Sequence, residues 1–198
     1  MRADATLLRL FYDPLGWADP AWLAHFGIDA RWPRRLGNSL LLRRAGAAPM
    51  TRSDLAFPGA AWLAANWSAL PVLAYLAGAR LARNSLMSGN ALLRLRYGAE
   101  RFVTLPVADA AWGRPGAEPV IAHETHGDIH DRVLAAGSHC LRAAWPALTP
   151  GWRDRLRLRL HPGLEMASSA EPAWASPTGA GCLHLLNHAL NFHHAQSY

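Results

Sequence analysis

The feature that most constrains the fold of this chain is a set of apolar residues at helical spacing, in segments opened by capping residues and closed by glycine or proline. The clearest case is residues 68–84. Ser68 stands where a helix N-cap is expected, and Pro71 lies in the first turn, where its missing N–H removes no intrahelical bond. The apolar face consists of Val72, Leu73, Leu76 and Ala79. This spacing predicts an α-helix through about Asn84.

The same pattern recurs along the chain. It predicts further helices at 19–27, 90–105, 128–145 and 181–194, with loops rich in proline, glycine or small polar residues at 108–119 and 165–181. We find no internal repeat. The sequence therefore predicts a mainly α protein, a single globular helical domain over residues 1–198 with about six to eight helices.

Residues 152–162 read WRDRLRLRLHP, and their secondary structure is ambiguous. The strict alternation of leucine and arginine is the period of a half-buried strand. Thr149 and Pro150, however, resemble an N-cap and a first-turn proline, and Leu156 and Leu160 could share a helical face. We favour a helix, because a single strand would have no partner elsewhere in the chain.

The basic charge comes entirely from arginine. The formal net charge is +6, from 20 basic and 14 acidic residues, and the chain contains no lysine. A nucleic-acid binder would gather such charge into a coherent stripe beside base-stacking aromatic residues. Here the arginines are scattered in ones and twos, so a basic nucleic-acid binder remains only an alternative.

The cysteines and apolar runs bear on the location of the protein. Cys140 and Cys182 belong to no paired-ligand or redox motif, and Cys140 lies on an apolar helical stripe, where it is expected to pack as a small hydrophobe. Arg80 and Arg83 interrupt the longest apolar run, so no segment approaches the roughly 18 to 20 residues of a spanning helix. We expect a cytosolic protein without a membrane span.

Catalytic motifs are lacking. We find no glycine-rich phosphate loop, no nucleophile elbow and no closely paired carboxylates, so we expect no enzyme and no cofactor. The histidines leave one alternative open. His184 and His188 are four residues apart, a spacing that places two imidazoles on one helical face and can hold a transition metal. A metal-binding protein or metal-dependent enzyme is that alternative.

Tryptophan is abundant, with nine residues. Most are expected to anchor a core, but Trp112 and Trp174 lie in loops rich in proline and small residues, where burial is less expected. Tryptophan and arginine are enriched at the energetic centres of protein interfaces. The combination favours a binding or scaffolding subunit.

Three segments resemble one known family. The arginine stretch 152–162, the opening LLRLFYDPLGWADPAWL and the stretch LPVLAYLAGARLARNSL are similar to the SctK (YscK-like) family of type III secretion sorting-platform accessory proteins. His161 departs from the family pattern, and the C-terminal helix is unusually rich in histidine. The resemblance implies a helical, non-enzymatic adaptor at the cytosolic face of the inner membrane. Its partners would be the cytoplasmic domain of an SctD-like ring protein and an SctQ-like pod protein, and through the pod an SctL-like stalk and SctN-like ATPase.

The candidate partner-binding residues follow from the arginine stretch and its neighbouring aromatic residues. They are Arg153, Arg155, Arg157, Arg159, Trp112 and Trp152. Arginine can bind carboxylates of an acidic partner while its stem lies on apolar surface. We expect the four arginines to divide between intramolecular pairing and an exposed basic face.

Overall fold

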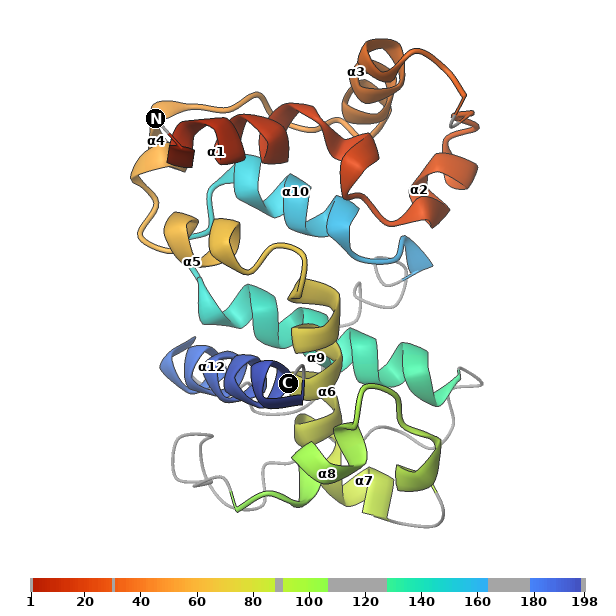
Figure 1. The fold of residues 1–198 in the computed structure, drawn as a ribbon, viewed down its shortest axis with the longest axis vertical. Coiled ribbons are helices and arrows are strands. Elements are labelled where there is room, and N and C mark those ends of the chain that lie inside the picture. Colours follow the sequence, from red (N-terminus) through yellow and green to blue (C-terminus); the bar gives the residue numbers. More distant parts are fainter. Residues whose placement is uncertain (1, 30, 88–90, 107–127, 164–178, 197–198) are drawn as a thin grey trace. The chain divides into compact units, whose positions relative to one another are not determined.

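The computed structural model describes residues 2–29, 31–87, 91–106, 128–163 and 179–196. Within these ranges the chain forms eleven α-helices and two short 3-10 helices, and no β-strand (Figure 1). The α-helices are α1 (Arg2–Tyr12), α2 (Pro20–His25), α3 (Arg34–Arg44), α4 (Arg52–Ala56), α5 (Ala60–Ala65), α6 (Leu70–Leu81), α7 (Arg83–Met87), α8 (Ala99–Thr104), α9 (Ile129–Ala144), α10 (Pro150–Arg159) and α12 (Gly179–Gln196). The 3-10 helices are η1 (Pro14–Gly16) and η2 (Leu92–Arg94). The prediction of a mainly α fold is confirmed.

The described α-helices are more numerous than the six to eight expected, and several of them are short. Five of the described α-helices, α2, α4, α5, α7 and α8, have only five or six residues. Local signals explain several of these ends. Pro20 opens α2 beneath the Asp19 N-cap, whose side chain accepts a hydrogen bond from the N–H of Ala21, and Gly27 follows with a positive φ.

The chain forms two compact units, each with its own internal contacts. The first unit comprises residues 1–68 and 147–166, and the second comprises residues 69–146 and 167–198. The single domain expected over residues 1–198 stays a prediction, and each unit is described by itself.

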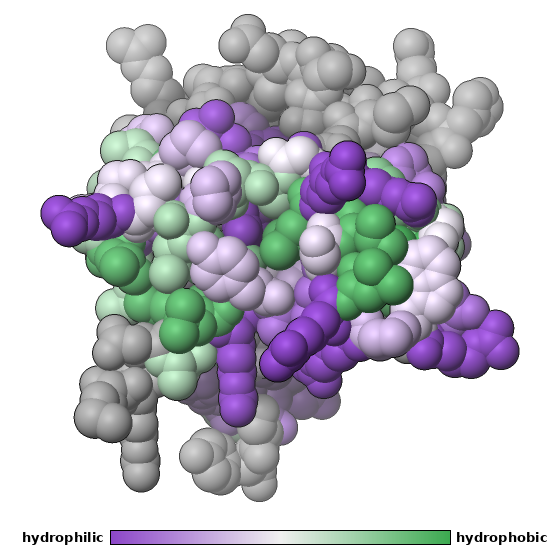
Figure 2. Space-filling model, turned by 90° about the horizontal axis from the view of Figure 1, so that it is seen from above, coloured by the Kyte–Doolittle hydropathy of each residue, from purple (hydrophilic) through white to green (hydrophobic). Residues whose placement is uncertain are grey.

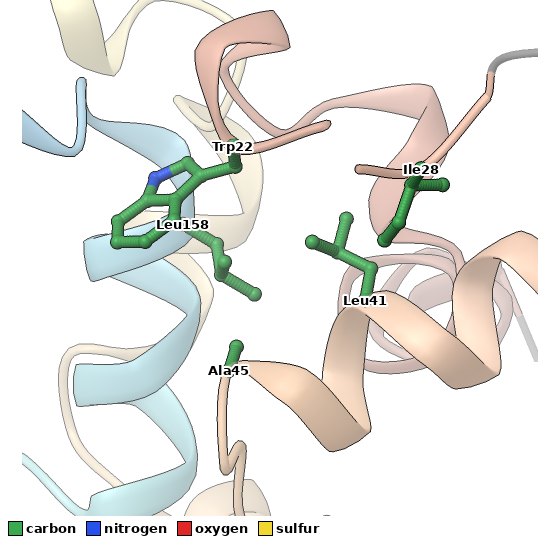
Figure 3. Packing of buried hydrophobic residues seen from close by; sticks show 5 residues of the cluster. All are labelled: Trp22, Ile28, Leu41, Ala45 and Leu158. Atoms are coloured by element: carbon green, nitrogen blue, oxygen red, sulfur yellow. The ribbon is translucent and has the colours of Figure 1, made fainter. Parts of the chain in front are cut away.

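The first unit is assembled around α10. Figure 3 shows one of its clusters, in which Leu158 of α10 lies with Trp22, Ile28, Leu41 and Ala45. The indole N–H of Trp22 donates to the carbonyl of Leu160 at 2.8 Å. Helix α10, from the later of the unit's two stretches of sequence, is therefore central to the packing of the N-terminal helices.

The helix predicted at 68–84 is confirmed as α6, but both ends differ, since α6 ends at Leu81 and Arg83 begins α7. The N-cap position is Ala69, which makes no side-chain capping bond, because Ser68 lies in the turn before it. Pro71 occupies the first turn as expected. The residues from Leu73 to Arg80 are all buried, so α6 is covered on every side rather than along one face.

The single helix predicted at 90–105 is wrong. The described part of this segment contains η2 and α8, and the chain between them turns at Tyr97 and Gly98, whose φ angles are 60° and 66°. Two successive residues in the left-handed region cannot continue a right-handed helix. The Tyr97 side chain stays half exposed, with its ring against Tyr75 at a centroid distance of 5.2 Å.

The second unit is held by a close crossing of α6 and α9. Gly78 of α6 faces the carbonyl of Val133, and Gly137 of α9 faces the carbonyl of Ala74. A Cβ added at either glycine would lie within 1.8 Å of the facing oxygen. The absence of side chains at these two positions lets the backbones touch. Helix α12 also packs on α9, where Cys140 and Cys182 are both buried. Cys140 is thus a packing residue, as expected.

Candidate functional site

The arginine stretch forms helix α10, so the preference for a helix is confirmed. Pro150 occupies the first turn. Thr149 is at the N-cap position, but its side chain does not cap the helix. The Thr149 hydroxyl instead donates to the carboxylate of Asp54. The alternating pattern arises because α10 is buried around most of its circumference, so apolar and basic positions both face the interior.

Arg155 lies inside the first unit and is only 1% exposed. Its guanidinium donates to the carbonyl of Phe11 at 2.9 Å and to the carbonyl of Ala48. The same group lies 4.6 Å from the centre of the Phe11 ring, a cation–π distance. Burial lowers the pKa of this guanidinium, although arginine stays protonated in proteins. Arg155 therefore holds two segments that are distant in sequence.

Arg157 and Arg159 make the same kind of contact. Arg157 donates to the carbonyl of Ala45, the C-cap residue of α3. Arg159 donates to the carbonyls of Trp67 at 3.2 Å, Trp17 at 2.5 Å and Ser68 at 2.8 Å. Trp17 is the C-cap residue of η1. Burial lowers the pKa of Arg159 too.

Three of these six acceptors share a structural property. The carbonyls of Phe11, Trp17 and Ala45 lie at the C-terminal ends of helices, where carbonyls lack an intrahelical donor and the helix dipole has its negative end. We call Arg155, Arg157 and Arg159 the internal arginines. Their guanidinium groups satisfy these carbonyls, so much of the basic charge of α10 is used within the first unit.

The remaining candidate residues divide between interior, surface and the undescribed part of the chain. Trp152 is fully buried, and its indole N–H donates to the carbonyl of Asp54 at 2.9 Å. Arg153 is exposed, and its guanidinium donates to the carbonyl of Leu148 at 3.3 Å. Trp112 lies outside the described residues. Arg153 is thus the α10 candidate most accessible to a partner, while a partner role for the set stays a prediction.

Positive charge is concentrated in the first unit. The first unit has twelve arginines and seven acidic residues, whereas the second has eight arginines and seven acidic residues. Several large apolar side chains of the first unit are also exposed, namely Leu8, Tyr12, Trp32, Leu36 and Leu55. In Figure 2, apolar side chains form separate clusters between strongly hydrophilic ones. Such a mixed surface suits contacts with another protein.

Asp54 links α4 to the start of α10. Its buried carboxylate accepts hydrogen bonds from the Thr51 backbone N–H at 2.7 Å, the Thr51 hydroxyl at 2.6 Å and the Thr149 hydroxyl. Burial alone would raise the pKa of Asp54, but these bonds outweigh it and hold the pKa below the ordinary aspartate value of 3.8. The ionised form is the one that the fold stabilises.

We expect Asp54→Asn to destabilise the first unit at neutral pH by about 1 to 3 kcal/mol, because an amide cannot accept all of these bonds. The Asp54 contribution is fully present above pH 3.8 and is lost as the pH falls through the lowered folded-state pKa. The difference in free energy of unfolding between wild type and variant should therefore shrink from pH 7 to pH 3. Urea unfolding at both pH values measures it. A difference that stays constant would show that the carboxylate charge is not responsible.

The histidine pair lies as its spacing predicted. The Nε2 atoms of His184 and His188 are 3.0 Å apart, and their ring centres are 4.4 Å apart. Burial, and secondarily the neighbouring His184, lowers the pKa of His188. Among the described residues, no group of three or more histidine, cysteine or acidic side chains could hold a metal ion. Three further histidines lie close together in the sequence, at 123, 126 and 130. His123 and His126 lie outside the described residues, and His130 contacts the Tyr75 hydroxyl at 2.6 Å.

In its described residues the protein belongs to the all-helical class. Three arginines of its basic helix α10 bind carbonyls inside the first unit, and its surface mixes apolar and basic side chains. None of its described helices is long and apolar enough to cross a membrane. A family model described as "Bacterial type III secretion apparatus protein (OrgA_MxiK)" matches residues 7–197. The chain belongs to this family of type III secretion apparatus proteins, which confirms the resemblance drawn from the sequence. Searches of curated proteins and of solved structures gave no match.

Proposed function

We propose that this protein is a non-enzymatic adaptor of a type III secretion sorting platform. In this role it joins the cytoplasmic domain of an SctD-like ring protein to an SctQ-like pod protein, which carries the SctL-like stalk and the SctN-like ATPase. It acts in the cytoplasm and is recruited to the cytosolic face of the inner membrane. The observation that carries the proposal is the family match over residues 7–197.

The charge distribution supports an acidic partner surface for the first unit. With its internal arginines engaged, the side chain of α10 offered to such a surface is Arg153. Arginine there can bind a carboxylate bidentately, a geometry that lysine cannot reproduce. The buried Trp152 and Arg155 act indirectly in this proposal, by holding the helix that presents Arg153.

Affinity purification from the native bacterium at moderate salt, with mass spectrometry, tests the adaptor role. We expect to recover ring and ATPase-complex subunits, and the same set after nuclease treatment. Recovery of nucleic acid alone, lost on nuclease treatment, would favour a nucleic-acid binder. Recovery of no secretion component would contradict the proposal.

Charge reversal tests the contribution of Arg153. We expect Arg153→Glu to lower the amount of partner recovered at least several-fold. Its free energy of unfolding should stay within about 0.5 kcal/mol of the wild-type value, because the position is exposed. Arg52→Glu is the matched control, because Arg52 is also an exposed arginine of the first unit and the change in net charge is identical. Equal recovery with both variants would remove Arg153 from the interface.

A further inference from the structure

The outer face of α12 presents two histidines on a firmly held helix. Cys182, Leu185, Leu186 and Ala189 are all fully buried on the opposite side of α12. His184 is exposed and His188 is half-buried. Side chains mounted on a packed helix keep their relative positions better than side chains on loops. The imidazoles are therefore preorganised one turn apart.

The separation of the two nitrogens matches a specific coordination geometry. Divalent zinc and similar ions bind imidazole nitrogen at about 2.0 to 2.1 Å. Two such bonds at a right angle put the nitrogens about 2.9 Å apart, whereas the tetrahedral angle puts them about 3.3 Å apart. The Nε2 atoms of His184 and His188 are 3.0 Å apart. The pair thus fits neighbouring positions of a square-planar or octahedral ion, the geometries typical of Cu²⁺ and Ni²⁺ with nitrogen ligands.

We propose that His184 and His188 form a two-imidazole site for Cu²⁺ or Ni²⁺. Without an ion, the short contact is a hydrogen bond in which one Nε2–H donates to the other Nε2. On binding, the proton of the donor ring moves to its Nδ1, so both neutral rings offer an Nε2 lone pair and no net proton is released. No third side chain of the types that bind metals joins them among the described residues, so water or a donor from another molecule fills the other positions.

This site is independent of the adaptor role. Its two histidines belong to the second unit, whereas Arg153 belongs to the first, and its occupancy can be measured with the isolated protein. Success or failure of the partner experiments therefore has no bearing on it.

Calorimetric titration of the full chain without a histidine tag, with Cu²⁺, Ni²⁺ and Zn²⁺ separately, tests the site. We expect one ion per chain, with Cu²⁺ binding more tightly than Ni²⁺. His184→Gln and His188→Gln should each weaken binding by about tenfold or more, because a single imidazole remains. Ni²⁺ should also raise the thermal unfolding midpoint of the wild type and of neither single variant, since a ligand that binds only the folded state stabilises it.

The double variant His193→Gln/His194→Gln is the matched control. These two histidines lie on the same helix but are adjacent in sequence, and their ring centres are 6.2 Å apart. Adjacent residues point to different sides of a helix, so this variant should bind as the wild type does. Failure of the wild type to bind, equal binding by the single variants or loss of binding in the control would each overturn the proposal. Tighter binding of Zn²⁺ than of Ni²⁺ would overturn the right-angle assignment.

Discussion

Gly137→Ala is expected to lower the free energy of unfolding of the second unit by about 3 kcal/mol. The added methyl group would lie 1.7 Å from the carbonyl oxygen of Ala74 and 3.0 Å from its Cα, and these backbone atoms cannot rotate away. Helices α6 and α9 would have to separate. The better helix propensity of alanine, about 1 kcal/mol, acts in the opposite direction and does not compensate.

Urea unfolding followed by far-ultraviolet circular dichroism measures this effect. Asp131→Ala is the control, because Asp131 is an exposed residue of α9 and its replacement should change stability by less than about 1 kcal/mol. Gly78→Ala should behave like Gly137→Ala, since its Cβ would lie 1.8 Å from the carbonyl oxygen of Val133. A Gly137→Ala protein as stable as the wild type would show that the helices do not cross this closely in solution.

Arg155→Met is expected to destabilise the first unit by about 3 to 5 kcal/mol. Methionine replaces much of the apolar stem but leaves the buried carbonyl of Phe11 and the partly buried carbonyl of Ala48 without the guanidinium donor. It also removes the cation from the Phe11 ring. Each buried acceptor left without a partner costs about 1 to 3 kcal/mol.

Arg153→Met provides the comparison for this variant. It makes the same chemical change two residues earlier on the same helix, at an exposed position, and should alter the free energy of unfolding by less than about 0.5 kcal/mol. Chemical denaturation of both variants distinguishes a structural from a superficial role. Similar stabilities would mean that Arg155 is dispensable for folding.

The helices whose signals are local could be predicted from the sequence. The segments that became α6, α9 and α12 have apolar residues at helical spacing, and Pro150 marked the start of α10. The helix predicted at 90–105 is wrong, because apolar spacing continues across Tyr97 and Gly98 although the backbone there turns left-handed. A glycine within a helical pattern was the available signal for this break.

The role of the arginines could not be predicted from their own segment. Their acceptors are carbonyls at Phe11, Trp17, Ala45 and Trp67, and backbone oxygens have no sequence signature. The glycine contact between α6 and α9 was equally hidden, since Gly78 and Gly137 are informative only once the two helices are known to cross. Local periodicity specifies elements, whereas tertiary hydrogen bonds depend on their pairing.

The division of the first unit between two stretches of sequence affects the order of events during synthesis. Residues 1–68 leave the ribosome first, but α10 emerges only after residues 69–146 have been made. Until then the nascent segment lacks Leu158 for its apolar cluster and the guanidinium groups that bind its helix ends. Many chains fold from the N-terminus as they are made. In this protein the earliest residues to be synthesised can complete their core only after Pro150–Arg159 has been made.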